Sequence, residues 1–391
     1  MVVFGLIPTQ TEPAVADITS NNGNCSPTIE DSAGNTISEA AGVLDIKQLD
    51  DGDCVIQFLD TTTDYEWTVP SNITEAWVLV VGGGGGGGCL GGSGGGGFVE
   101  YSSYDISNDS DASDDLVSIS VASGGLGSGK SSSDSTNARP ELEMKGGTSS
   151  FGDIDAIGGG GGGCLNEKGK DGASAGGAGT DGRTVISHSA SDFPSLYSGD
   201  GIAETFGSIS VGASKSGHCT AGQTRCTDDK VGIGSGGGGA GGASGTNSED
   251  TKISFNTIHG GDGGSGKNSS ISGSDENFSP GGGGGIFVNE DNGDTLINSY
   301  EQSLGGSGAA NKGAVRAKFD STDDDLAPVA GHANTGQGGG GGAFTARSGA
   351  NGGSGIVIVR YTPPVQVEVD NSCSVLGSVS TSNVTTQTAS D

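Results

Sequence analysis

The stretch EAWVLVVGGGGGGGCLGGSGGGGFVEY, residues 75–101, places a run of β-branched and aromatic residues directly before seven glycines. The run from Trp77 to Val81 is typical of a buried strand. A second such run, IVIV at 356–359, lies near the end of the glycine-rich region. Flexible glycine-rich linkers lack such runs, so we expect the region between them to be ordered.

Glycine limits the size of any side-chain core. The chain has 391 residues, of which 80 are glycine and 31% are hydrophobic, so a large conventional core is not expected. Glycine in regular structure costs about 0.5–1 kcal/mol relative to alanine, because it loses more backbone entropy on folding. Ordered glycine tracts therefore need regular backbone partners.

Glycine tracts recur along the chain at 82–88, 158–163, 236–239, 281–285 and 338–342. Variable polar stretches separate them, a rhythm typical of repeated passes through one structural body. Glycine can form the extended threefold helix of the polyproline II type, which has no internal hydrogen bonds. Neighbouring tracts must then satisfy one another's N–H and C=O groups, and the sequence predicts a bundle of packed polyglycine II helices.

The fold class that we predict is all-β, with a small β-sandwich flanking the polyglycine bundle and variable loops on the surface. The composition changes at Tyr65, and Pro363 and Pro364 cannot donate to a strand ladder. We therefore expect an N-terminal β segment at 1–64, a glycine-rich domain at 65–362, and a C-terminal strand and tail at 363–391. The expected sandwich core is Trp67, Val69, Trp77, Leu79, Val81, Ile356, Val357 and Ile358.

The net charge is −31, from 48 acidic and 17 basic residues. Phosphate contacts require Lys and Arg, so this balance argues against nucleic-acid partners. No segment reaches the roughly 18 apolar residues of a membrane span, and we expect no membrane insertion.

The seven cysteines lack the short C-x2-4-C pairs that would indicate zinc, so disulfides are the better interpretation. The contexts GGGGGGGCLGG and GGGGGGCLNE are near-copies, and we pair Cys89 with Cys164. We also expect Cys25–Cys54 and Cys219–Cys226, which leaves Cys373 over. This disulfide density indicates an oxidising compartment or an extracellular particle.

Four motifs in order, WTVPSNITEAWVLVVGGGGGGG, LVSISVASGG, GGTSSFGDIDAIGGGGGG and GGSGIVIVRYTPP, make a specific resemblance. Over about residues 65–362 the chain resembles the glycine-rich domain of secreted bacterial surface proteins and of phage tail fibres and adhesins. The resemblance implies an extracellular, cell-surface or virion-tail β-sandwich with packed polyglycine helices, used for structure or adhesion. It supplies no catalytic residues.

The motifs that could carry chemistry are weak. GGLGSGKS at 124–131 formally matches a phosphate-binding loop, but the following residues have no helical apolar period. The four histidines, His188, His218, His259 and His332, are scattered, and we expect no enzyme. Calcium is the one cofactor left open, against the alternative of solvated acidic loops, because no cluster has the spacing of a twelve-residue calcium loop. The clusters are Asp109, Asp111, Asp114 and Asp115; Asp291 and Asp294; and Asp323, Asp324 and Asp325.

Two functions remain as alternatives. The first, which we favour, is an extracellular filament or surface-appendage subunit that also has an adhesive role, in which apolar end segments complete the sheet of a second copy. The intersubunit candidates are Val3, Phe4, Ile7, Val365, Val367, Val369 and Cys373. The second is a phage tail-fibre or tip adhesin that binds a cell-surface glycan or protein through exposed aromatic residues. The candidates are Tyr104, Phe193, Tyr197, Phe287 and Tyr300, unless they anchor their own loops.

Overall fold

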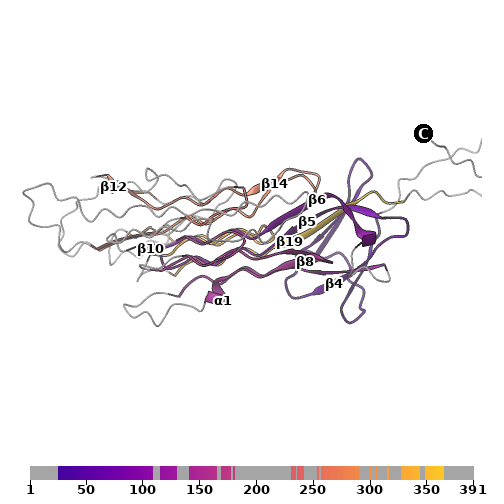
Figure 1. The fold of residues 1–391 in the computed structure, drawn as a ribbon, viewed down its shortest axis with the longest axis horizontal. Helices are drawn as coiled ribbons and strands as arrows, with labels where there is room; N and C mark the ends of the chain where they lie inside the picture. The colour runs from indigo at the N-terminus through magenta and orange to yellow at the C-terminus, as the bar shows by residue number, and fades with distance from the viewer. Residues whose placement is uncertain are drawn as a thin grey trace, which may run out of the picture.

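A β-sandwich forms one end of an elongated molecule, and long glycine-rich segments run away from it side by side (Figure 1). The computed structural model describes residues 25–108, 115–129, 141–164, 169–177, 179–180, 230–234, 236–241, 253–254, 257–289, 299–301, 305, 315–316, 327–343 and 348–364. Helix within these residues is limited to η1 (Ile106–Asn108) and α1 (Glu141–Met144). The predicted all-β fold class is confirmed.

The first sheet of the sandwich has one buried and one exposed face. Its strands lie in the order β1 (Thr28–Asp31), β4 (Asp64–Thr68), β7 (Leu116–Ser120), β8 (Ser149–Phe151) and β9 (Ile154–Ala156), all antiparallel. In β4, Tyr65 and Trp67 are buried while their neighbours are more exposed. This alternation is the period of two expected for a half-buried strand.

The second sheet contains the two apolar runs. Its antiparallel order is β2 (Leu44–Gln48), β3 (Cys54–Phe58), β19 (Ile356–Tyr361), β5 (Glu75–Val81) and β6 (Phe98–Asp105). The last strand of the chain thus lies in the middle of this sheet, between β3 and β5. The final four residues of β5 and the first four of β19 are all buried, so both faces of this sheet are covered.

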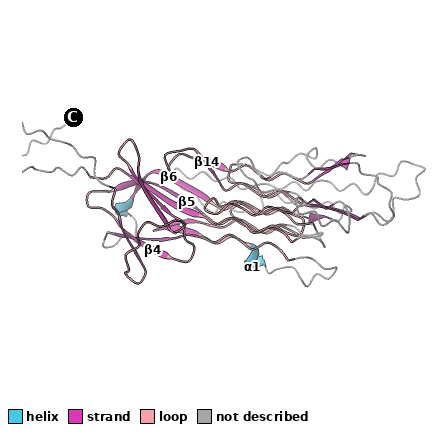
Figure 2. Ribbon diagram, turned by 180° about the vertical axis from the view of Figure 1, so that it is seen from behind, coloured by secondary structure: helices cyan, strands magenta, loops and turns pink. Residues whose placement is uncertain are grey.

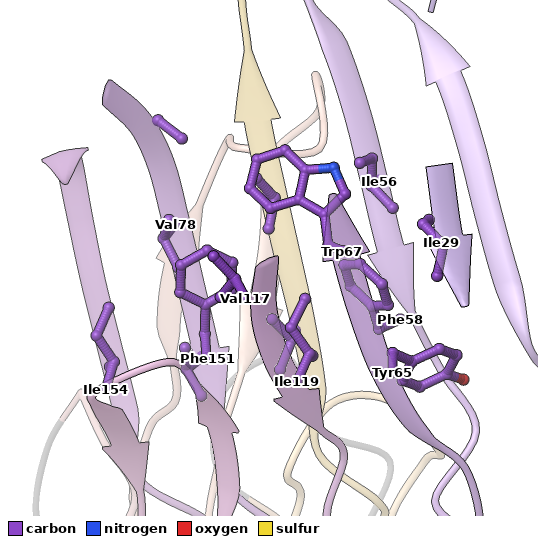
Figure 3. Packing of buried hydrophobic residues seen from close by; sticks show 14 of the residues in the cluster. Ile29, Ile56, Phe58, Tyr65, Trp67, Val78, Val117, Ile119, Phe151 and Ile154 are labelled. Atoms are coloured by element: carbon purple, nitrogen blue, oxygen red, sulfur yellow. The ribbon is translucent and has the colours of Figure 1, made fainter. Parts of the chain in front are cut away.

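The core between the two sheets is aromatic. Phe58, Tyr65, Trp67 and Phe151 point into this space (Figure 3), and the rings of Phe58 and Tyr65 meet edge to face at 5.0 Å. The predicted core positions Trp67, Val69 and Val357 are confirmed here.

The expected placement of Leu79, Val81, Ile356 and Ile358 in that core is wrong. They lie on the opposite face of the second sheet, because successive side chains of a strand alternate between its faces. There they pack against Ile271 and Phe278 of a hairpin formed by β14 (Lys267–Ser269) and β15 (Glu276–Phe278). Trp77 is only partly buried on the same face.

The sandwich begins before Tyr65. Strands β1, β2 and β3 come from the predicted N-terminal segment, yet β1 pairs with β4 and β3 pairs with β19. A disulfide joins Cys25 to Cys54 at the start of β3. The segment at 25–64 is therefore part of the sandwich.

Two small sheets lie away from the sandwich, at what we call the distal end (Figure 1). The first, the distal sheet, has the order β10 (Gly179–Thr180), β11 (Lys230–Gly234), β16 (Ile286–Asn289) and β18 (Val315–Arg316). The second has the order β12 (Ile253–Ser254), β13 (Thr257–His259) and β17 (Ser299–Glu301). Between the sandwich and these sheets the described chain is mostly drawn as loop, with the short helix α1 (Glu141–Met144) beside it, as the view from behind shows (Figure 2).

Candidate functional site

The segment at 82–88, which continues directly from β5, has hydrogen-bond partners that repeat every three residues. Each of its seven amides donates to a backbone carbonyl at 2.8–3.1 Å, and every third amide reaches the same neighbouring segment. The neighbours are 91–97 for Gly82, Gly85 and Gly88; 144–147 for Gly83 and Gly86; and 350–353 for Gly84 and Gly87. A period of three agrees with a threefold helix, and polyglycine II stays our prediction for this backbone.

The carbonyls of the same segment accept from three further neighbours. The amides of Gly159 and Gly162 donate to the carbonyls of Gly83 and Gly86, respectively. In the same order, the amides of Gly125 and Ser128 donate to Gly84 and Gly87, and those of Gly339 and Gly342 donate to Gly85 and Gly88. Segment 82–88 is thus surrounded by six segments. We call the hydrogen-bonded set 82–88, 91–97, 124–128, 144–147, 157–163, 169–177, 236–241, 260–266, 279–285, 336–342 and 349–353 the glycine lattice.

Close packing leaves no room for side chains around segment 82–88. A Cβ atom at Gly85 would lie 2.2 Å from the Gly160 carbonyl oxygen, one at Gly86 would lie 2.0 Å from that of Leu126, and one at Gly87 would lie 2.0 Å from that of Gly340. These three directions cover all sides of the segment. Glycine is therefore required here for close approach rather than for an unusual backbone angle.

Segment 91–97, which leads into β6, is a second interior member of the lattice. Its amides at Gly91, Gly94 and Gly97 donate to 157–163, and those at Ser93 and Gly96 donate to 336–339. It also accepts from 82–88 and, at Gly92 and Ser93, from Gly177 and Gly282. The sequence did not identify several lattice segments as tracts, because serine, alanine, methionine or leucine interrupts their glycines. A three-residue spacing of small residues, as in ASAGGAG at 173–179, is the signal that could have found them.

Two buried serines supply side-chain hydrogen bonds inside the backbone network. The Ser93 hydroxyl donates to the Gly85 carbonyl oxygen at 2.6 Å, or to that of Gly339 at 3.0 Å. At the junction with the sandwich, the Ser149 hydroxyl donates to the Val81 carbonyl oxygen at 2.7 Å and accepts from the Ala122 amide at 3.0 Å. Ser149 thus satisfies groups at the point where β5 ends and the period changes from two to three.

A polar hollow of about 250 Å³ lies at the outer end of the sandwich, which is the end away from the lattice. A β-bulge shapes it, because Ser102 and Ser103 of β6 together oppose Trp77 of β5. The Arg360 guanidinium lies 5.4 Å from the Trp77 ring centre and is ion-paired with Asp53 at 2.8 Å and with Asp51.

The polar groups of this hollow largely satisfy one another. The Ser103 hydroxyl donates to Glu75, the Thr362 hydroxyl donates to Asp53, and the Trp77 Nε1–H donates to Glu100. Burial opposes ionisation of Asp53, but the bonds from Thr362 and Arg360 and the Arg360 charge outweigh it and hold the pKa of Asp53 below its usual value. Burial raises the pKa of Tyr361 to about 12. These hydrogen bonds and ion pairs stabilise the outer end of the sandwich.

Two of the three predicted disulfides, Cys25–Cys54 and Cys89–Cys164, are present. Cys219, Cys226 and Cys373 lie outside the described residues. The two disulfides fit an oxidising, extracellular location. None of the helices in the described part of the chain is long and apolar enough to cross a membrane.

The structure places the described surface-recognition candidates in different parts of the molecule. Tyr104 is partly buried against the sandwich core, with its ring 6.0 Å from that of Phe151, which favours the alternative that it anchors its own segment. Phe287 lies on β16 and Tyr300 on β17, both away from the sandwich. Phe193 and Tyr197 lie outside the described residues, as do the intersubunit candidates Val3, Phe4, Ile7, Val365, Val367 and Val369.

The segment 124–129, the described part of the formal phosphate-loop match, is largely a lattice segment. The amides of Gly125 and Ser128 donate to the carbonyls of Gly84 and Gly87, so these donors are already engaged. Of the acidic clusters considered for calcium, only Asp115 lies within the described residues, and those residues contain no group of three His, Cys, Asp or Glu placed to hold a metal ion.

A family model described as a glycine-rich domain matches residues 60–362. The match starts close to the predicted boundary at 65 and ends at the predicted boundary at 362. No curated protein matches the chain.

Proposed function

The chain belongs to the glycine-rich domain family, and on this premise we propose that it is an extracellular structural protein that assembles with copies of itself into a filament or surface appendage and has an adhesive role there. The observation that carries the proposal is segment 82–88, which has six hydrogen-bonded neighbours. A body held by backbone bonds on every side resists bending and shear in all directions. Such stiffness suits a mechanical element.

Both ends of the described chain lie at the outer end of the sandwich. Cys25 is bonded to Cys54, and Cys54 pairs with Tyr361 on β19, next to Thr362. Contacts made through the terminal segments would therefore join outer ends and leave the distal end free. This polarity supports an appendage that is attached at the sandwich and projects the lattice outward.

The partner that we propose is a second copy of the chain. The alternating apolar residues at 365–369 suit strand addition to an exposed sheet edge. The second sheet offers β2 and β6 as edge strands. Val3, Phe4 and Ile7 offer a similar segment, and Cys373 offers a covalent link between copies.

Negative-stain electron microscopy of the purified chain tests self-assembly. We expect filaments for the unmodified protein. Deletion of residues 1–10 tests the N-terminal segment, and a triple variant tests the C-terminal one: Val365→Asp, Val367→Asp and Val369→Asp. A matched control places the same charges later in the tail: Ser378→Asp, Ser380→Asp and Ser382→Asp. Filaments in the control but not in the triple variant support strand addition at 365–369, whereas single particles at all concentrations of the unmodified protein would contradict self-assembly.

A receptor-binding tip is the second candidate, and the position of the distal sheet, at the opposite end of the described chain from Cys25 and Thr362, favours it. Residues 181–229 connect β10 to β11, and both strands belong to the distal sheet. A distal end held on a rigid body is suited to contact a cell-surface glycan or protein. Replacing residues 181–229 with a short Gly-Ser linker should abolish cell binding and leave the melting temperature unchanged if this function holds. Cell binding that survives the replacement would count against it.

A further inference from the structure

The turn formed by Cys89 and Leu90 joins the two interior segments of the lattice, and other segments converge on it. Both residues are fully buried. The Leu90 carbonyl oxygen accepts from the Gly285 amide at 2.6 Å. A Cβ atom at Gly234 or at Gly341 would lie 2.0 Å from the same oxygen. Three segments that are distant in sequence therefore meet at one carbonyl group.

The same turn contacts the distal sheet. A Cβ atom at Gly179, on β10, would lie 2.5 Å from the Cys164 carbonyl oxygen and 2.9 Å from the Leu90 Cβ. Gly179 pairs with Gly234 of β11, and Ile233 of β11 pairs with Ile286 of β16. Two adjacent strands of the distal sheet thus end at the turn, and the third, β16, follows directly after Gly285.

The two ends of the lattice are fixed by different means. At the sandwich, strands such as β5 and β9 continue directly into lattice segments 82–88 and 157–163, and their side chains set the register. In a lattice whose partners repeat every three residues, a shift of three residues re-creates the same glycine bonds, so the distal end needs an anchor of its own. Among the described residues, the one covalent connection there is the disulfide between Cys89 and Cys164, whose Cα atoms are 4.7 Å apart.

We propose that the Cys89–Cys164 disulfide is a redox-sensitive latch that holds the distal sheet on the glycine lattice. A dithiol reductant opens it: the S–S bond takes up two electrons and two protons and becomes two thiols, while the dithiol is oxidised to its own disulfide. With the disulfide reduced, the Cys89–Leu90 turn becomes more mobile, and the distal sheet loses its packing against that turn. The sandwich keeps its structure, because its aromatic core lies at the other end and does not depend on the Cys89–Cys164 bond. This coupling would serve a filament subunit and a tip protein alike.

Hydrogen–deuterium exchange of the full-length chain tests the latch. We compare the unmodified protein with a double variant, Cys89→Ser with Cys164→Ser, and with a matched control that removes the other disulfide, Cys25→Ser with Cys54→Ser. In the first variant we expect exchange in β10, β11 and β16 to accelerate on the order of tenfold or more, while β3, β5 and β19 are unchanged. In the control, acceleration should be confined to the sandwich. Unchanged protection of β10, β11 and β16 in the first variant would overturn the proposal.

Tryptophan fluorescence separates an open latch from general unfolding. The chain has two tryptophans, Trp67 and Trp77, and both lie in the sandwich. An open latch leaves their emission unchanged, whereas equal acceleration throughout the chain with shifted emission contradicts a local latch. If the first variant does not fold, the control variant is folded oxidised and then treated with dithiothreitol, with reduction verified by mass. A distal sheet that stays protected after verified reduction also overturns the proposal.

Discussion

Several stretches of chain run directly from a strand of the β-sandwich into the glycine lattice, as β5 does into 82–88. Side chains hold the sandwich together, whereas backbone groups hold the lattice together. In β5, Val78 and Val80 face the inter-sheet core while Leu79 and Val81 face the hairpin, so side chains alternate with a period of two. From Gly82 onward the backbone itself makes the contacts, with a period of three. An added side chain is therefore tolerated on the exposed face of the sandwich and excluded inside the lattice.

The largest expected effect comes from a β-branched residue inside the lattice. Gly85→Val should lower the free energy of unfolding by about 4 kcal/mol or more, because overpacking costs about 1–3 kcal/mol and each buried group that loses its partner costs a further 1–3 kcal/mol. Thermal or denaturant unfolding followed by circular dichroism measures this. Ser118→Val is the matched control, because Ser118 is exposed on β7, where a β-branched residue should change stability by less than about 0.5 kcal/mol. Similar melting temperatures for the two variants would contradict a side-chain-free lattice.

Truncating a buried side chain in the second sheet tests the opposite case, in which side chains rather than backbone groups make the contacts. Leu79 is fully buried under the β14–β15 hairpin, so Leu79→Ala should cost about 3 kcal/mol through lost contacts and a cavity. Exchange protection should fall in 267–278, which the hairpin spans, more than in β4 and β7 of the first sheet. A loss centred on the first sheet would place Leu79 in the inter-sheet core after all.

The two faces of the second sheet show how much of the fold could be predicted from the sequence. The apolar runs at 77–81 and 356–359 identify strands, because a local pattern encodes a buried strand. The local pattern does not encode which strands pair, so the position of β19 between β3 and β5 could not be predicted. The hairpin was missed because Ile271 and Phe278 are its only fully buried apolar residues, separated by serine, glycine and acidic residues.

The sequence predicts that the glycine tracts pack against one another, but it does not predict which segments lie next to which. Glycine tracts and the near-copies around Cys89 and Cys164 are visible in the sequence, and the disulfide between those two cysteines follows from them. The six neighbours of 82–88 come from segments as distant as 350–353, and backbone contacts leave no side-chain pattern. Leu90 was not singled out for the same reason, since its carbonyl group, rather than its side chain, gathers the distal segments.

A smaller effect is expected where a side chain does enter the lattice. Ser93→Ala removes the hydroxyl that donates to Gly85 or Gly339 but leaves both carbonyls with backbone donors. The loss should therefore be close to one ordinary hydrogen bond, about 1 kcal/mol. Denaturant unfolding measures it, with Ser93→Thr as the contrast, because Ser93 is fully buried and an added methyl group there should overpack the lattice and cost more. Equal stability of Ser93→Thr and the unmodified chain would show that the lattice is looser than the contacts indicate.

The smallest expected effect is a pH dependence at the outer end of the sandwich. The pKa of Asp53 is lowered in the folded chain from its ordinary value of 3.8. A carboxylate with a lowered folded pKa stabilises the fold above its unfolded pKa, and this contribution is lost as the pH falls through the folded value. The melting temperature of Asp53→Asn should therefore lie below that of the unmodified chain at about pH 6, and the gap should narrow toward about pH 3. Thermal scans across this range measure the gap. Because the Arg360 partnership is confined to the sandwich, lattice exchange at 82–88 should not differ between the two proteins at either pH, and a difference there would mean that the two regions do not hold together independently.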